Sequence, residues 1–385
     1  MKGHRLAEKI IDESDIKHLI NWLRTNPQLT KGKLTVEFEK LWSNWIGTKY
    51  AVFCNSGSSA NLLMAYASLL SGKLKNKKVI VPSVGWVTTI APFIQFGFEP
   101  IMCGADADNF GMDMDQLENL LKKHGPGIVI YVQVLGVPGD MERLLKLKQQ
   151  YGFMLLEDAC AALGAEYDGK KVGSLSDMSS FSFYFGHQLS TIEGGMINTN
   201  NGKLYKLLLM LRSHGWGKDL DENARKNLMK KNNIDGRHEP FTFFVPGFNL
   251  RSTDLNAFLG IRMMEKADRV MDIRKRNHLI YAKNLRTVSG QKWNTKATPC
   301  SISYGALAKN PEHRKLIVQK LDENGIETRL FSAGNLGRHP FWVDRYGRFS
   351  DEVSDRIHEC GFFLPNNESI TTEEIRKICG VVNSV

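Results

Sequence analysis

Short apolar runs that alternate with helical stretches are the feature that most limits how this chain can fold. Residues 128–132 are five apolar residues in succession, and similar runs recur with helix-like stretches between them. Such runs are typical of largely parallel strands that helices cover on both faces. The sequence therefore predicts a three-layer α/β domain. The predicted strands comprise residues 50–53, 79–81, 128–132, 153–156, 178–185 and 196–199.

The pattern changes near residue 270, after which polar helices dominate. A chain of 385 residues suits one large domain and one smaller domain. We expect a large α/β domain over residues 1–270 and a small α+β domain over residues 271–385, with the extreme N-terminal segment a candidate to pack on the small domain. The expected elements of the small domain are helices over 271–285, 313–324 and 371–378 and a strand over 301–307.

The basic composition is compatible with two classes of partner. A formal net charge of +10 fits a nucleic-acid-binding protein, and it equally fits an enzyme that acts on a polyanion such as a nucleotide sugar. The densest basic stretch, residues 225–231, is followed by acidic residues, and we interpret it as a solvated helix face. The sequence has no basic motif with interleaved aromatic residues, so we expect no nucleic-acid partner.

The six cysteines indicate a reducing compartment and no metal site. They lie far apart, without a CxxC pair or zinc-type spacing. The N-terminal residues lack an apolar signal-like segment, and the sequence has no window of eighteen uncharged apolar residues. We expect a cytoplasmic protein that does not associate with membranes.

A small polar turn after the first predicted strand is a candidate phosphate site. Residues 55–59 read Asn-Ser-Gly-Ser-Ser and precede a helix-like run over residues 60–70. Such a turn offers free backbone N–H groups, small hydroxyls and the positive end of a helix dipole. A plain helix cap of Ser and Gly has the same pattern, so both interpretations stay open here. The sequence has no P-loop and no GxGxxG fingerprint after a strand.

Two further segments place polar groups at predicted strand ends. Glu157 and Asp158 end a very apolar strand, at the edge where ligands of open α/β sheets bind. A carboxylate at that edge can keep a pyridine nitrogen protonated, although two acids that cap the next helix are the alternative. In residues 181–196, His187 follows a predicted strand and precedes a Gly-Gly pair, where the backbone turns tightly or approaches a ligand.

Taken together, these segments resemble the sugar-nucleotide aminotransferase family, whose members have the aspartate-aminotransferase fold of type I pyridoxal-phosphate enzymes. The resemblance covers most of the chain and implies that fold, with a three-layer αβα large domain and a smaller α+β domain. Five motifs occur in the family's order: SGSSAN, VPSVGWVTT, EDACAALGA, FSFYFGHQLSTIEGGM and PGFNLRSTDLNAFLG.

The resemblance implies a role for six residues in binding pyridoxal or pyridoxamine 5'-phosphate. Gly57, Ser58 and Ser182 would hold the cofactor phosphate. Trp86 would stack on the pyridine ring, and Asp158 would bind the ring nitrogen. Asn249 would reach the phosphate of the neighbouring subunit's cofactor, which implies a homodimer with shared active sites.

The sequence departs from the family pattern at the catalytic lysine. His187 stands where the family has the lysine that binds the cofactor covalently, and Ala161 replaces a common glutamine. The nearest lysines, Lys170, Lys171 and Lys203, fall outside the motif. Because an imidazole cannot make a stable covalent link to the aldehyde, we expect the cofactor to be held non-covalently. With a pKa of about 6.5, a neutral histidine can serve as the base instead.

A narrower pattern, with FGH in the lysine motif and LRSHGW at residues 211–216, resembles the family's 3-dehydratases of colitose and O-antigen biosynthesis. This resemblance implies loss of the C3 hydroxyl from GDP-4-keto-6-deoxymannose, with L-glutamate restoring the amine form of the cofactor. A related dehydrase type binds an iron–sulfur cluster through cysteines downstream of the histidine. No cysteine lies between Cys160 and Cys300, so we expect no cluster.

Two questions stay open at this point. Arg329, Arg251 and Arg338 are candidates for contacts to the nucleotide sugar, although a solvated arginine is a comparable interpretation for each. The function also has two alternatives: an aminotransferase that makes a 4-amino-4,6-dideoxy sugar, and a non-catalytic scaffold that has lost the lysine.

Overall fold

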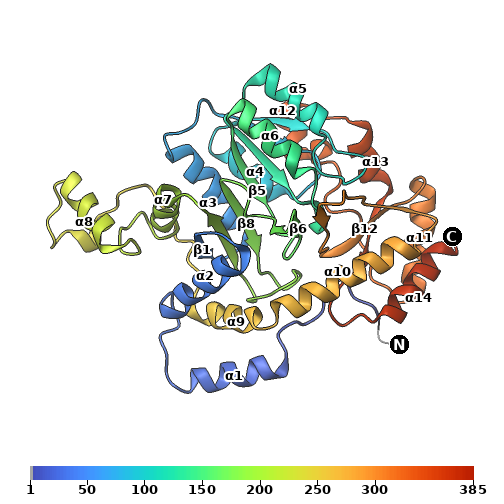
Figure 1. Cartoon of the computed structure of the whole chain (residues 1–385), viewed down its shortest axis with the longest axis horizontal. Coiled ribbons are helices and arrows are strands. Elements are labelled where there is room, and N and C mark those ends of the chain that lie inside the picture. The colour runs from blue at the N-terminus through green and yellow to red at the C-terminus, as the bar shows by residue number, and fades with distance from the viewer. Residues whose placement is uncertain (1–2) are drawn as a thin grey trace.

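A seven-stranded sheet forms the centre of the molecule. The computed structural model describes residues 3–385, and its sheet has the strand order β1-β9-β8-β5-β4-β2-β3 (Figure 1). Strands β8, β5, β4, β2 and β3 pair in parallel, whereas β9 is antiparallel to both β1 and β8. The strands are β1 (Tyr50–Cys54), β2 (Lys78–Pro82), β3 (Glu99–Cys103), β4 (Ile128–Val132), β5 (Met154–Asp158), β8 (Met178–Ser182) and β9 (Gly195–Thr199).

Helices cover both faces of this sheet, which confirms the predicted three-layer α/β fold. One apolar cluster packs α3 (Gly57–Leu70), α4 (Val87–Gln95) and α7 (Gly202–Arg212) against one face. Alternate side chains of the same strands point to the other face, because successive residues of a strand alternate between faces. That face is covered by α2 (Lys33–Ile46), α5 (Met114–His124), α6 (Met141–Tyr151) and α9 (Asp254–Met264).

The elements of the large sheet region that were not predicted include strand β3 and helix α4. Strand β3 contains Glu99 and Pro100, and α4 contains Pro92, so neither segment has the usual composition of its element. The predicted strand over residues 178–185 is shorter in the structure and ends at Ser182. The chain then turns, which leaves His187 beyond the strand end.

The C-terminal part of the chain forms a second, smaller sheet of antiparallel strands, β10 (Ser289–Gly290), β12 (Ser303–Leu307) and β13 (Gly361–Pro365). Its apolar core includes side chains of α10 (Ala267–Asn284), α11 (Pro311–Glu323) and α14 (Thr372–Asn383). Near the N-terminus, His4 pairs with Ile326 of this part. Helix α10 runs through residue 270, and the domain division proposed there stays a prediction.

Two helices extend from the body of the molecule (Figure 1). Helix α1 (Glu13–Leu23) is capped by Asp12 and Asp15 in a capping box, so it begins earlier than expected from Ser14. Its apolar residues Ile16, Ile20 and Leu23 are exposed. Helix α8 (Glu222–Lys231), which holds the whole basic stretch, has no buried residue and is the solvated helix that the sequence predicted.

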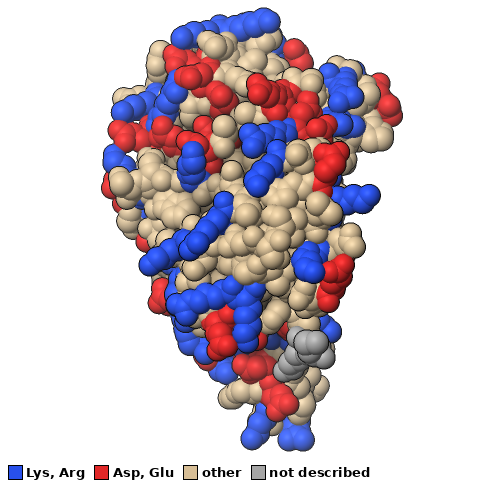
Figure 2. Space-filling view, turned by 90° about the vertical axis from the view of Figure 1, so that its right-hand side faces the viewer, with Lys and Arg blue, Asp and Glu red and all other residues tan. Residues whose placement is uncertain are grey.

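Charged side chains of both signs are interspersed on the face shown in Figure 2, so the net charge of the chain is not gathered into one basic patch there. Over residues 3–385, none of the helices has the length and apolar character that a membrane span requires.

A buried ion pair connects helices α7 and α2 to strand β1. The guanidinium of Arg212, at the end of α7, donates to Glu39 Oε1 of α2 at 2.5 Å and to the carbonyl oxygen of Phe53 in β1 at 2.8 Å. Glu39 also accepts from the Phe53 backbone N–H at 2.8 Å. Arg212 is 1% exposed and also pairs with Asp219 at 3.0 Å, whereas the charge of Glu39, which is 7% exposed, is compensated by Arg212.

We predict that Arg212→Met lowers the free energy of unfolding by about 3–5 kcal/mol, because it leaves the Glu39 carboxylate buried without its partner. Urea denaturation followed by circular dichroism measures this loss. The control is Lys146→Met, which breaks an exposed pair with Glu142 and is expected to lower the free energy of unfolding by less than about 1 kcal/mol. Equal losses in the two variants would show that the buried pair is not a structural requirement.

Candidate active site

The carboxylate of Asp158, at the carboxyl end of β5, is buried and held by three hydrogen bonds. Its Oδ2 accepts from Asn61 Nδ2 at 2.8 Å and from Thr89 Oγ1 at 2.6 Å. Its Oδ1 accepts from the Cys160 backbone N–H at 3.1 Å. The residues after Asp158 form turns instead of a helix, so the alternative that this acid caps a helix is wrong.

Glu157 points to the other face of the sheet and has a structural role. It is fully buried, and its Oε1 accepts from Gln133 Nε2 at 2.8 Å and from the Gly173 backbone N–H at 2.9 Å. Burial raises the pKa of the Glu157 carboxyl against the effect of these donors. The two acids at the strand end are therefore separated by the alternation of side chains along β5.

Asn61 and Thr89 were not identified from the sequence. The Ser180 hydroxyl of β8 donates to Asn61 Oδ1 at 2.6 Å, which orients the amide so that its N–H group points to Asp158. A signal was present in the spacing, because Asn61 lies four residues after Gly57 and therefore on the same face of α3. Which acid that face meets is a tertiary contact and could not be read from the spacing.

The polar turn before α3 combines both interpretations suggested by the sequence. The Ser56 hydroxyl caps the helix by accepting from the Ser59 backbone N–H at 3.1 Å. Among residues 3–385, nothing accepts from the backbone N–H groups of Gly57 and Ser58. These two groups are free donors at the positive end of the α3 dipole, as an oxyanion site requires.

Ser182 lies against this turn. A Cβ atom at Gly57 would be only 2.6 Å from the Cβ of Ser182, so glycine is needed for the close contact between α3 and β8. The Ser58 hydroxyl is on the exposed side and donates to Thr88 Oγ1 at 3.3 Å. The three predicted phosphate-binding residues, Gly57, Ser58 and Ser182, are thus brought together.

His187 lies in the turn after β8, with a half-buried ring near Asp158. Its Nδ1 atom is fully buried and has no hydrogen-bond partner among the described residues. Desolvation lowers the pKa of His187 to about 4, although the Cys160 backbone and the Asp158 charge oppose the shift. The expectation of an ordinary pKa near 6.5 is therefore wrong for this form of the protein, and the ring is neutral near pH 7.

Trp86 and Asn249 border the site. Trp86, at the start of α4, is 58% exposed. Asn249 is exposed, and its Oδ1 accepts from Arg251 Nε at 3.0 Å. The Arg251 backbone pairs with Cys54, so Arg251 lies beside the polar turn of its own chain.

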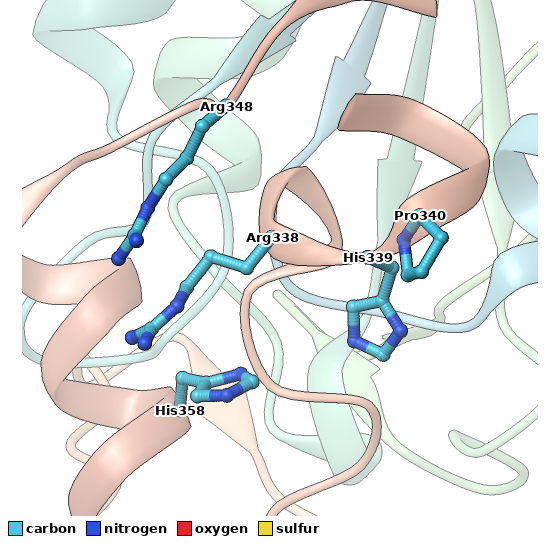
Figure 3. A pocket seen from close by; sticks show the side chains of 5 residues that line it. All are labelled: Arg338, His339, Pro340, Arg348 and His358. Atoms are coloured by element: carbon cyan, nitrogen blue, oxygen red, sulfur yellow. The ribbon is translucent and has the colours of Figure 1, made fainter. Parts of the chain in front are cut away.

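The three candidate arginines contact different residues and do not share one pocket. Arg251 contacts Asn249 and His214. The Arg329 side chain is 71% exposed and its Nη2 lies 3.4 Å from Glu327 Oε1. Arg338 lines a different pocket, together with His339, Pro340, Arg348 and His358 (Figure 3).

The lysines nearest to His187 in the sequence are also not at the site. Lys170 is exposed in the short strand β7 (Lys170–Lys171), and Lys171 Nζ lies 4.7 Å from the centre of the Trp45 ring. Lys203 is exposed in the first turn of α7.

These groups fit pyridoxal or pyridoxamine phosphate. Free backbone N–H groups and two serine hydroxyls suit the phosphate, the buried carboxylate of Asp158 suits a pyridinium nitrogen, and the open face of Trp86 suits an aromatic ring. The fold and the site together define a type I pyridoxal-phosphate enzyme.

Residues 9–383 match the DegT/DnrJ/EryC1/StrS aminotransferase family. The chain belongs to this family.

Similar proteins cover almost the whole chain. The GDP-4-keto-6-deoxy-D-mannose 3-dehydratase of Yersinia pseudotuberculosis is 29% identical over an alignment 386 residues long, which covers 98% of this chain and 97% of that protein. The E. coli GDP-4-keto-6-deoxy-D-mannose-3-dehydratase with bound hydrated PLP has a TM-score of 0.89 at 25% identity, covering 99% of this chain and 100% of that one. A GDP-4-keto-6-deoxymannose-3-dehydratase with a trapped PLP-glutamate geminal diamine has a TM-score of 0.88 at 27% identity, covering 98% and 100%.

We predict that Asn61→Leu lowers the free energy of unfolding by about 1.5–3 kcal/mol and weakens cofactor binding, because a buried carboxylate loses a donor. Thermal denaturation and titration with pyridoxal phosphate measure both effects. The control is Ser68→Ala, a buried polar residue of the same helix that donates only to Met64 O. Unchanged cofactor affinity in Asn61→Leu would show that Asn61 does not position Asp158.

We also predict that the His187 imidazole of the cofactor-free protein titrates near pH 4, because desolvation disfavours its charged form. The unfolded chain binds a proton at this residue below about pH 6.5 and the folded chain does not. His187 therefore does not lower the free energy of unfolding above pH 6.5. Below pH 6.5 the free energy of unfolding decreases as the pH falls toward 4, because only the unfolded chain gains the proton. Nitrogen NMR of wild type and His187→Asn identifies the ring, and a midpoint near 6.5 would contradict its desolvation.

Proposed function

We propose that this protein removes the C3 hydroxyl from GDP-4-keto-6-deoxymannose and thereby makes a deoxysugar for lipopolysaccharide biosynthesis. The observation that carries the proposal is His187, a neutral imidazole beside Asp158 at the position where the family has a lysine. The dehydratases that resemble this chain over nearly their whole length support it. L-Glutamate is the proposed amino donor that restores the cofactor between turnovers.

When bound, pyridoxamine phosphate supplies a primary amine and an electron-withdrawing ring. In our proposal, Asp158 holds the ring nitrogen, and the Asn61 and Thr89 donors keep this carboxylate in place. Trp86 covers one face of the ring. The N–H groups of Gly57 and Ser58, with the Ser58 and Ser182 hydroxyls, bind the phosphate, so the cofactor needs no covalent bond.

His187 is the proposed catalytic base. Its ring is neutral near pH 7, so a ring nitrogen is available to accept a proton. An imidazole has no primary amine, so His187 cannot form the covalent link to the cofactor that the family's lysine forms. It therefore moves protons without binding the cofactor, which favours elimination of the hydroxyl over transfer of an amino group.

We propose a homodimer with shared active sites, in which Asn249 binds the phosphate of the partner's cofactor. The exposed position of Asn249 supports this arrangement. The site is bordered by exposed apolar side chains, and α1 also has an exposed apolar face, as expected of a surface that a second copy covers. The exposed apolar side chains are Ile16, Ile20, Leu23, Trp86, Tyr184, Phe185 and Ile192.

Two further assignments follow from the same hypothesis. Arg329, Arg251 and Arg338 are the proposed contacts to the nucleotide part of the substrate. The proposed location is the cytoplasm, and the six free cysteines of the structure support a reducing compartment.

The competing function is an aminotransferase that makes a 4-amino-4,6-dideoxy sugar, which the family also contains. The two reactions differ in the sugar product, because only the transferase leaves nitrogen on the sugar. We therefore predict that wild-type protein with pyridoxamine phosphate, glutamate and GDP-4-keto-6-deoxymannose yields a sugar that has lost its C3 oxygen and contains no added nitrogen. Mass spectrometry of the product measures this, and an amino sugar would establish the transferase instead.

We predict that His187→Asn lowers the rate of dehydration by about 10²–10⁴, because asparagine keeps the polarity but cannot accept the proton. His124→Asn, in the last turn of α5, is the matched control and is expected to leave the rate unchanged. Pyridoxamine-phosphate affinity of His187→Asn, measured separately, distinguishes loss of the base from loss of the cofactor. Undiminished dehydration by His187→Asn would remove His187 as the base.

A further inference from the structure

A cationic pocket lies between the C-terminal helices, and of its lining residues only Arg338 is among the proposed substrate contacts. Its volume is about 320 Å³, and two guanidinium and two imidazole side chains line it (Figure 3). They come from the segment before α12 (Pro340–Tyr346), from the loop after it and from α13 (Glu352–Cys360). The lining residues are Arg338, His339, Pro340, Arg348 and His358.

Both guanidinium groups have N–H donors available for a ligand. Arg338 uses only Nη1 for its two acidic neighbours, Asp355 Oδ1 at 3.5 Å and Glu359 Oε1 at 2.8 Å. Its Nε and Nη2 have no partner among residues 3–385, and the guanidinium of Arg348 has none there either. Figure 3 shows the two guanidinium groups extending to the same side, with the His358 ring below them.

The His358 imidazole adds a donor to the pocket without needing to be charged. His358 Nδ1 accepts from the Asn335 backbone N–H at 3.3 Å, so the proton of the neutral ring is on Nε2. Desolvation, Arg338 and His339 lower the pKa of His358, which keeps the ring neutral near pH 7. His339 Nε2 donates to the Ala333 carbonyl oxygen at 2.7 Å, so this N–H group is not available to a ligand.

The two carboxylates near the pocket do not close it. Asp355 is held from other directions, because its Oδ1 accepts from Asn335 Nδ2 at 2.9 Å and its Oδ2 from the Ser350 hydroxyl at 2.5 Å. The Glu359 side chain is 49% exposed and contacts only the Nη1 atom of Arg338. An anion can therefore bind the remaining guanidinium edges without displacing either carboxylate.

We propose that this pocket is a binding site for a phosphate-type oxyanion. Two guanidinium groups that present paired N–H donors match the geometry of phosphate oxygens. The volume is sufficient for phosphate or for part of a nucleotide. The phosphate has two possible sources, free inorganic phosphate and the phosphates of a nucleotide, and only the second rests on the proposed function.

Two hydrogen bonds connect the segment beside this pocket to the segment that precedes Trp86. The Ser332 hydroxyl donates to the Gly85 carbonyl oxygen at 3.0 Å, and the Leu336 N–H donates to the Ser83 carbonyl oxygen at 2.8 Å. Trp86 directly follows Gly85. An oxyanion held by Arg338 would therefore lie close to the segment that supports the exposed tryptophan.

Titration calorimetry and phosphorus NMR with inorganic phosphate and with GDP test the proposal on the full chain. Wild type should bind at least one probe saturably at this site, and Arg348→Glu should bind it roughly tenfold or more weakly, because it loses a charged donor pair. Arg348 has no partner within residues 3–385, so the variant should keep the thermal stability of wild type. Arg345→Glu is the matched control, since Arg345 is exposed on α12 and does not line the pocket.

The two sources differ in competition. Displacement of bound phosphate by GDP in wild type assigns the site to nucleotide phosphates, whereas bound phosphate that GDP does not displace assigns it to free phosphate. The proposal is overturned if neither probe binds saturably, or if Arg348→Glu and Arg345→Glu bind both probes as wild type does. Dehydratase activity does not enter this measurement, so its result is independent of the proposed reaction.

Discussion

The arrangement of the site depends on the hydrogen bonds that one buried carboxylate requires. Asp158 is 6% exposed at the end of β5, where a charge without hydrogen bonds would be strongly unfavourable. Its donors come from three places in the chain: Asn61 near the start of α3, Thr89 near the start of α4 and the backbone of Cys160. Satisfying this carboxylate therefore brings the beginnings of two helices to the same strand end.

The other parts of the site follow from these contacts. Gly57 and Ser58 lie one helical turn before Asn61, so the free N–H groups of α3 are placed near Asp158. Trp86 precedes Thr89 by three residues and is placed at the same edge of the sheet. His187 comes from the turn after β8, which is the direct neighbour of β5 in the sheet. The hydrogen bonds that stabilise the buried Asp158 carboxylate thus also determine where a cofactor can bind.

The sequence predicted the parts of this arrangement that depend on local pattern. The apolar runs identified six of the seven strands of the main sheet. The strand-end position indicated Glu157 and Asp158 as candidate site residues, and the family resemblance selected Asp158. The sequence could not show that Asn61 and Thr89 hold this acid, because their contacts join residues far apart in the chain. The depressed pKa of His187 likewise arises from desolvation by tertiary packing. The pocket around Arg348 has the same origin, since α13 supplies one of its walls.

The central claim is that an imidazole occupies the position of the cofactor-binding amine and that no lysine replaces it. Borohydride reduction of the protein with one equivalent of pyridoxal phosphate, followed by intact-mass measurement, tests this directly, because only a link to a primary amine is fixed by reduction. The account predicts an unmodified wild-type chain, whereas His187→Lys should gain the mass of one cofactor under the same conditions. A wild-type chain that gains the mass of one reduced cofactor, assigned by peptide mass mapping to a lysine of the site, would contradict the account.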